Sequence, residues 1–364
     1  MTTLTLGKAI NEGLRRALAG DDKVVLMGED IGTLGGVFRI TDGLKAEFGA
    51  NRVVDTPLSE AGIVGTAVGL AYRGFRPVIE IQFDGFIYPA FDQIVAQVAK
   101  LHYRSRGNVR MPITFRVPFG GGIGAAEHHS ESPEAYFAHT AGLRVIACSN
   151  PADAYVMIQQ AIASDDPVLF FEPKRRYHVK GEVDETASLA DAKPMGVASV
   201  VASGTDVTLV TYGGLVQTAR DAAVAAAEDG VSIEVIDLRS LAPVDYATVE
   251  ASVRRTGRLV ITHEAGQQGG VGAELAASVT ERCFEFLEAS GVDVEGLERD
   301  VAVEADRAAA ELRAACIAIA DPEPMSVFDH VYAEPNTHLA RQRDHYARYL
   351  AMFDETSDTA GGAR

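Results

Sequence analysis

Residues 144–153 read RVIACSNPAD, an apolar run followed directly by a polar helix start. The run 144–148 has the length and character of a buried strand. After it, Asn150 can cap free backbone amides, Pro151 suits the first helical position, and Asp153 complements the positive end of a helix. A strand that leads at once into a helix is the building unit of an α/β fold.

The same alternation extends toward the N-terminus. Apolar runs predict strands at 23–28, 77–83, 112–117 and 167–171, and amphipathic or small-residue stretches predict helices at 6–18, 62–72 and 90–101. Several of the strands are continuous apolar runs, which is typical of a parallel sheet covered on both faces. The alternation is lost at 178–199, where charged and small residues dominate, and we predict a linker there.

A second α/β region follows, with strands expected at 207–212, 232–238 and 258–263 and helices at 213–228, 246–255 and 269–287. From residue 288 the chain has helical patterns only, at 295–319 and 338–353, and residues 355–364 are expected to be disordered. The sequence therefore predicts a first α/β domain at 1–177, a linker at 178–199, a second α/β domain at 200–287 and a helical tail at 288–364.

Composition excludes several classes of protein. The 364 residues suffice for two ordinary domains. A net charge of −18 argues against nucleic acid as a partner. The acidic residues are spread along the chain, so we favour solubility over a docking surface for a basic partner. No apolar run reaches the roughly 20 residues that cross a bilayer, and the start MTTLT lacks a secretory signal. Three cysteines without metal-ligand spacing make neither a disulfide framework nor a metal site, so a cytoplasmic protein is the simplest interpretation.

A glycine-rich string, GGGIG at 120–124, follows the third predicted strand. It lacks the Lys-Ser/Thr of a P-loop and the spacing of a dinucleotide motif, so a flexible loop is a fair alternative. Open α/β sheets nevertheless bind ligands beyond the carboxyl ends of their strands. His128 and His129 come just after it. Adjacent histidines rarely converge on one metal, but a histidine at that edge titrates near neutral pH.

Two further features are ambiguous from the residues alone. Glu60 precedes a small-residue helix, and a carboxylate there is usually explained by the helix dipole. Phe83, Phe86, Tyr88 and Phe91 cluster near the end of the second predicted strand, and packing in a core or an interface explains most such clusters.

Taken together, these strings resemble the β subunits of the thiamine-diphosphate-dependent decarboxylating component of 2-oxo acid dehydrogenase complexes, of the pyruvate and branched-chain type. The resemblance covers roughly residues 4–287, and seven ordered matches make it specific. The matching strings are MGED (27–30), TPLSE (56–60), EIQF (80–83) running on to FDQ (91–93), HSESPE (129–134), FEPK (171–174), VIDLRS (235–240) and HEA (263–265). It implies two α/β domains with parallel sheets, a pyrimidine-binding domain and a transketolase C-terminal-like domain.

The resemblance also implies roles for single residues. Glu60 falls where a glutamate meets the pyrimidine ring of thiamine diphosphate, and in this context its functional role prevails over the dipole alone. Phe86 falls where an aromatic ring packs on that pyrimidine, and Leu58 and Gln82 line the pocket. His129 matches a histidine that handles protons during acyl transfer to a lipoyl group. The cofactor itself supplies the electron sink for decarboxylation.

The chain has no Gly-Asp-Gly string followed by Asn, which in this family binds Mg²⁺ and the diphosphate on the α subunit. The resemblance therefore implies a site shared with an α subunit, in an assembly of two α and two β chains, so that this chain alone is catalytically incomplete. The second domain would contact another β subunit and dock to a lipoyl acyltransferase core. Some members bind a monovalent cation through backbone carbonyls, and the sequence leaves that site open. The substrate is a small-molecule 2-oxo acid; EIQF with FDQ favours a branched-chain one, and pyruvate stays open.

The family pattern ends near Leu287. β subunits continue with a strand, a proline-rich turn and a closing helix, whereas residues 321–325 and 328–335 resemble the C-terminal tail of the α subunit. Loss of that strand and helix would expose an unpaired edge, so we predict that the second domain is the least stable part of the molecule. Two alternatives remain. One is another transketolase-like thiamine enzyme, although these usually carry both cofactor-binding halves in one longer chain. The other is a non-catalytic assembly or docking protein that retains the fold.

Overall fold

The computed structural model describes residues 1–125, 127–291, 293–319, 323–329 and 336–357. They fall into two compact units, Met1–Cys283 and Phe284–Arg364. No helix among the described residues is both long enough and apolar enough to cross a membrane.

The main sheet has seven strands in the order β12-β6-β7-β5-β4-β2-β3. All neighbours are parallel except β12, which runs antiparallel to β6. The strands are β2 (Val24–Gly28), β3 (Val53–Asp55), β4 (Arg76–Glu80), β5 (Thr114–Phe119), β6 (Arg144–Ala147), β7 (Val168–Pro173) and β12 (Ser240–Ala242). The predicted parallel sheet is confirmed, although β3 and β12 are too short to show a strand pattern in the sequence.

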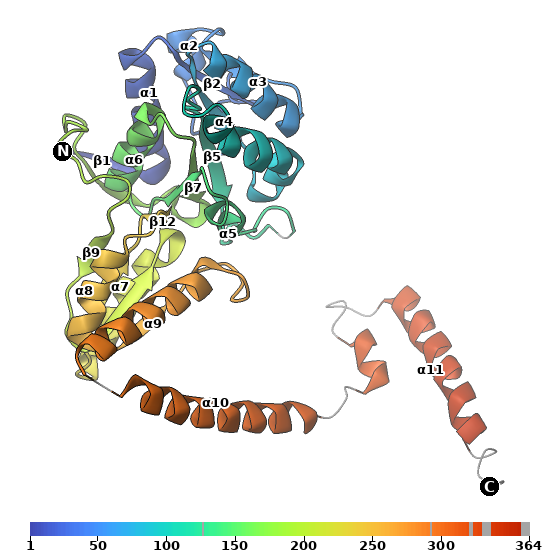
Figure 1. Cartoon of the computed structure of the whole chain (residues 1–364). Helices are drawn as coiled ribbons and strands as arrows, with labels where there is room; N and C mark the ends of the chain where they lie inside the picture. Colours follow the sequence, from blue (N-terminus) through green and yellow to red (C-terminus); the bar gives the residue numbers. More distant parts are fainter. Residues whose placement is uncertain (126, 292, 320–322, 330–335, 358–364) are drawn as a thin grey trace. The chain divides into compact units, whose positions relative to one another are not determined.

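Helices cover both faces of this sheet (Figure 1). On one face α1 (Leu6–Gly20) packs against α6 (Pro151–Ala163), and on the other lie α3 (Glu60–Tyr72) and α4 (Ala99–Arg104). Successive strand residues enter opposite cores: Val78 packs with α1 and α6, and Ile79 packs with α3. Because both faces are buried, several strands are nearly continuous apolar runs, as the sequence indicated, although β4, β5 and β7 also carry buried charged residues.

The start of α6 matches the sequence prediction in detail. The side-chain oxygen of Asn150 accepts a hydrogen bond from the Asp153 amide at 3.0 Å, and Pro151 is the first helical residue. The helix predicted at 90–101 is wrong in detail. It is broken into a 3₁₀ segment η1 (Asp84–Ala90), a π-helical segment η2 (Gln93–Val98) and α4. Pro89 lacks the N–H that a continuous helix from residue 84 would need.

The segment predicted as a linker contains a strand. β8 (Lys180–Val183) pairs antiparallel with β1 (Thr2–Thr5) at the N-terminus. The first α/β region therefore extends to residue 183. This strand is short and largely exposed, so it carries no apolar pattern that the sequence could reveal. A short helix α2 (Leu44–Phe48), a second short helix α5 (Glu134–Ala138) and the turn η3 (Lys174–Arg176) complete this region.

The second sheet has the order β13-β10-β11-β9, with β9 (Ser199–Ala202) antiparallel and the others parallel. The predicted strands are found as β10 (Val207–Thr211), β11 (Ile233–Asp237) and β13 (Leu259–Ile261). The predicted helices are found as η4 (Gly213–Leu215) with α7 (Val216–Glu228), α8 (Tyr246–Thr256) and α9 (Val271–Ala289). The core of this region is continuous with that of the first, because Tyr212, Ile236 and Leu238 join the same buried cluster as Phe119 and Phe171.

The second unit is helical. It contains α10 (Val294–Ile317) and α11 (Thr337–Ser357), where the sequence predicts helices, and the short 3₁₀ segment η5 (Pro324–Phe328), which the sequence did not indicate. Residues 355–357, predicted to be disordered, belong to α11 instead. Residues 320–322, 330–335 and 358–364 lie outside the described part of the chain, and with them much of the segment that resembles an α subunit.

Candidate active-site edge

The predicted site residues gather at the carboxyl edge of the main sheet. Glu60 follows β3, Gln82 and Phe86 follow β4, and His129 follows β5, while Glu29, which was not among the predicted residues, follows β2. These four strands are neighbours in the order β5-β4-β2-β3 and all run parallel. Their carboxyl ends therefore share one edge, where open α/β sheets bind ligands.

Two carboxylates lie near each other at this edge. Glu60 is the first residue of α3, next to Ser59, whose hydroxyl accepts a hydrogen bond from the Gly62 amide at 3.3 Å. Burial, followed by the nearby charges of Glu60 and Asp30, raises the pKa of Glu29. Glu29 is only 8% exposed, and its buried Oε1 finds no hydrogen-bond partner among the described residues. The pair therefore has an unused polar atom that a ligand could satisfy.

The sequence alone assigns no role to Glu29. It belongs to the MGED string, but a carboxylate directly after a buried strand was the only local signal. Its position beside Glu60 depends on the pairing of β2 with β3, which brings residues about 30 positions apart in the sequence together.

Gln82 and Leu58 take different places at the edge. Gln82 is half-buried, and its Nε2 donates to the backbone oxygen of Glu29 at 3.4 Å, so it ties the end of β4 to the end of β2. Leu58 is 81% exposed in this chain. A large apolar side chain this exposed is suited to contact with another chain or a ligand.

Phe86 and His129 come together around Phe83. The ring of His129 lies 4.4 Å from Phe83 and 5.2 Å from Phe86, both edge-on, and the two phenylalanine rings are 5.7 Å apart. Tyr88 and Phe91 instead pack against Tyr136. The aromatic cluster is thus two groups, of which only the first includes a titratable ring.

The surroundings of His129 define its tautomer. Its Nδ1 lies 2.8 Å from the backbone oxygen of Glu127. A carbonyl oxygen only accepts, so Nδ1 must carry the hydrogen, and Nε2 of the neutral ring is then the free base. His128 is exposed and lies 3.4 Å from the Glu127 carboxylate. His129 therefore belongs to the aromatic group around Phe83, whereas the neighbouring His128 is exposed.

A buried ion network supports the strands under the edge. Arg116 on β5 donates to both oxygens of Glu172 on β7, at 2.7 and 2.9 Å, and also to Glu80 on β4. The Tyr177 hydroxyl donates to Glu172 at 2.7 Å. These carboxylates hold the pKa of Arg116 above its usual range against the opposing effect of burial, although burial is the largest single influence. The network therefore ties the three neighbouring strands β4, β5 and β7 to one another.

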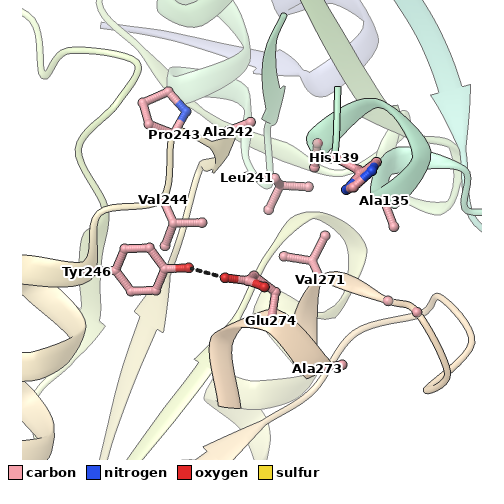
Figure 2. A pocket seen from close by; sticks show the side chains of 13 residues that line it. Ala135, His139, Leu241, Ala242, Pro243, Val244, Tyr246, Val271, Ala273 and Glu274 are labelled. Atoms are coloured by element: carbon pink, nitrogen blue, oxygen red, sulfur yellow. Dashed lines mark hydrogen bonds between the residues drawn. The ribbon is translucent and has the colours of Figure 1, made fainter. Parts of the chain in front are cut away.

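A cavity of about 820 Å³ lies elsewhere, between α5, the segment that includes β12, and the start of α9. Figure 2 shows His139, Leu241 and Val271 around it, with the Tyr246 hydroxyl donating to Glu274 at 3.4 Å. None of the predicted site residues lines it. Across the described residues, no group of three or more His, Cys, Asp or Glu side chains is arranged to hold a metal ion.

Family models of known domains match both α/β regions of the chain. Residues 2–180 match the transketolase pyrimidine-binding domain, and residues 196–320 match the transketolase C-terminal domain. A solved structure described as a split-gene transketolase in an inactive β4 tetramer shares the fold, with a TM-score of 0.64 at 22% identity. The likeness covers 76% of this chain and 84% of that one.

Two curated relatives are much closer in sequence. The pyruvate dehydrogenase E1 component subunit beta of Leifsonia xyli is 60% identical over 296 residues, which are 81% of this chain and 87% of the relative. The 3-methyl-2-oxobutanoate dehydrogenase subunit beta of Mycobacterium tuberculosis is 56% identical over 288 residues, which are 79% of this chain and 82% of the relative.

Proposed function

The chain belongs to the β subunits of the decarboxylating component of 2-oxo acid dehydrogenases, and on that basis we propose that it forms one half of a thiamine diphosphate site which an α subunit completes. The observation that supports this most directly is the Glu29–Glu60 carboxylate pair with its unpartnered buried oxygen. The exposed Leu58 beside it suits a site whose other wall is a second chain.

The residues fit the aminopyrimidine end of the cofactor. Glu60 would hold a proton at the ring nitrogen, and Phe86, half-buried beside His129, offers an aromatic face for the ring. The described residues offer no carboxylate cluster for Mg²⁺, so in this proposal the α subunit holds the metal and the diphosphate. Thiamine diphosphate, when bound, supplies the nucleophile and the electron sink for loss of carbon dioxide.

The second half-reaction transfers the acyl group to lipoamide. The lipoyl group enters as a disulfide, so acylation of one sulfur breaks the S–S bond and leaves the other sulfur as a thiolate that needs a proton. Nε2 of His129 is not used in the backbone hydrogen bond and, when it carries a proton, can deliver it to that sulfur. Phe83 and Phe86 pack edge-on against the His129 ring. In this proposal the working unit is a cytoplasmic assembly of two α and two β chains on a lipoyl acyltransferase core.

The substrate is a small 2-oxo acid, for which we propose a branched-chain acid or pyruvate. One relative is named for pyruvate and another for 3-methyl-2-oxobutanoate, at similar identities. The two acids differ by an isopropyl group in place of a methyl group, and the site half that surrounds this group includes the partner chain. Rates with the two acids on the assembled enzyme therefore decide the substrate.

Calorimetric titration of thiamine diphosphate with Mg²⁺ tests the shared site. We expect tight binding to a mixture of this chain with an α subunit of the family, and none to this chain alone. Glu60→Ala should abolish binding by the mixture, whereas Glu228→Ala, an exposed glutamate at the end of α7, should not change it. Tight binding to the chain alone would contradict the half-site. Absence of binding in the mixture would favour a non-catalytic docking protein, for which the α-like tail is the motivating feature.

A further inference from the structure

A buried ion pair lies under the segment that carries His129. Nζ of Lys174 is 2.5 Å from Oδ1 of Asp84, and both side chains are completely buried. Lys174 follows β7 and Asp84 begins η1 after β4, and β5 lies between these two strands in the sheet. The pair therefore bridges the end of β5, from which the chain continues to His129.

Backbone hydrogen bonds connect the Asp84 end of this bridge, and separately the end of β5, to residues 127–131, here called the histidine segment. The amide of Gly85, next to Asp84, donates to the backbone oxygen of His128 at 3.1 Å. The amide of Gly120, at the end of β5, donates to the backbone oxygen of Glu131 at 2.8 Å. The histidine segment is thus tied to the sheet on either side of His129.

The ion pair also adjoins the ring that contacts His129. Lys174 Nζ lies 5.8 Å from the centre of the Phe83 ring, within the range of a cation–π contact, and Phe83 in turn contacts the His129 ring. Burial raises the pKa of Asp84, and the hydrogen bond from Lys174 opposes this. Each of the two buried side chains, Asp84 and Lys174, therefore needs the opposite charge of the other in order to stay ionised.

Space around Gly85 excludes any larger residue. A Cβ there would lie 2.6 Å from both the Cα and the backbone oxygen of His128, so the histidine segment would have to move. The segment is itself in an unusual backbone conformation, since φ is 29° at Glu127 and 61° at His128. Such a conformation persists only where its surroundings impose it.

We propose that Asp84, Lys174 and Gly85 form a clamp that positions His129 for proton transfer. These are positioning residues that act through the histidine segment. The clamp rests on the proposed role of His129, but its structural part can be measured without the cofactor.

Hydrogen exchange of the full chain, followed by mass spectrometry, tests the structural part. In Asp84→Asn and in Gly85→Ala we expect exchange at the Gly85 and Gly120 amides to rise by about tenfold or more, because their acceptors on the histidine segment move. Gly85→Ala changes no charge, so it also serves if Asp84→Asn fails to fold. Asp229→Asn is the matched control, because it makes the same change at an exposed aspartate at the end of α7, far along the chain from the clamp. Unchanged exchange at both amides, or an equal rise throughout both sheets, would overturn the clamp.

Kinetics of the assembled enzyme test the positioning role. Lys174→Met should lower kcat for lipoamide acylation by about tenfold while KM for the 2-oxo acid stays constant, and Lys174→Arg should restore part of the loss. Faster exchange in the segment with an unchanged kcat would overturn the positioning role. If His129→Ala also leaves kcat unchanged, the failure lies in the proposed function of His129, since the exchange data report on the clamp by themselves.

Discussion

Asp237 is a buried carboxylate at the end of β11, outside the proposed site. Its Oδ2 accepts from Ser149 at 2.6 Å and its Oδ1 accepts from the Arg239 amide at 3.1 Å. Burial is the main cause that raises the pKa of Asp237 to about 7. Because the folded state holds this proton more tightly than the unfolded chain, folding is favoured most at low pH. That contribution declines as pH rises from about 4 to about 7.

Asp237→Asn should therefore stabilise the protein at pH 8 relative to the unchanged chain, with little effect at pH 4. An amide can donate to Ser149 and accept from Arg239, so both hydrogen bonds survive without a buried charge. The difference in Tm between variant and parent, measured at several pH values, is the direct readout. A difference that stays constant across this range would show that Asp237 keeps its ordinary pKa.

Within the site, single residues differ in how readily the sequence reveals them. Glu60, Phe86 and His129 stand in family strings, and the structure brings all three to one edge. Glu29 stands in such a string too, but only the structure shows that its side chain is buried near Glu60. Lys174 and Asp84 are 90 positions apart, and only the order of strands makes them a pair.

At the scale of single elements, α6 shows how local chemistry defines a boundary. Asn150 satisfies the Asp153 amide at the helix start. Asn150→Ala should destabilise the protein by about 1 kcal/mol, the usual effect of losing such a cap. Urea unfolding measures this, with Asn108→Ala as control, because Asn108 is an exposed asparagine in a turn whose side chain donates to the nearby Ser105 backbone oxygen. Equal midpoints for Asn150→Ala and the parent chain would mean that the cap contributes nothing.

Strand β13 lies at an edge of the second sheet. Within the described residues it pairs with β10 alone, and Val260 on it is 49% exposed. An edge strand with an exposed β-branched residue is open to pairing with another chain. This open edge is the arrangement expected if the second α/β region lacks a neighbouring strand.

At the scale of the whole molecule, the two α/β regions are less separate than the sequence suggested. β12 comes from the second region but pairs with β6 in the first sheet, and one buried cluster runs through both. The hydrophobic term is proportional to the apolar area removed from water, so this shared core couples the stabilities of the two regions. The helical unit from Phe284 onward is a separate body.

Limited proteolysis tests the order of stability in the first unit. We expect early cuts between residues 200 and 283, near β9 or β13, while residues 1–177 stay intact. The cause is the open second sheet, which has four strands against seven in the first. Mass spectrometry of the fragments at increasing times gives the order. Cleavage within 1–177 first, or both regions at the same rate, would contradict the expectation and favour the coupling through the shared core.

The sequence by itself determined the α/β class, the parallel sheet buried on both faces, the start of α6 and the family, because each is written in a local pattern or an ordered set of strings. Only the tertiary structure decided that β12 joins the first sheet, that the helix near residue 90 is broken, that Glu29 lies buried near Glu60, and that Asp84 and Lys174 meet under the histidine segment. The physical reason is range. Periodicity and capping act over a few residues, whereas these contacts join residues tens of positions apart, and their geometry depends on which strands become neighbours.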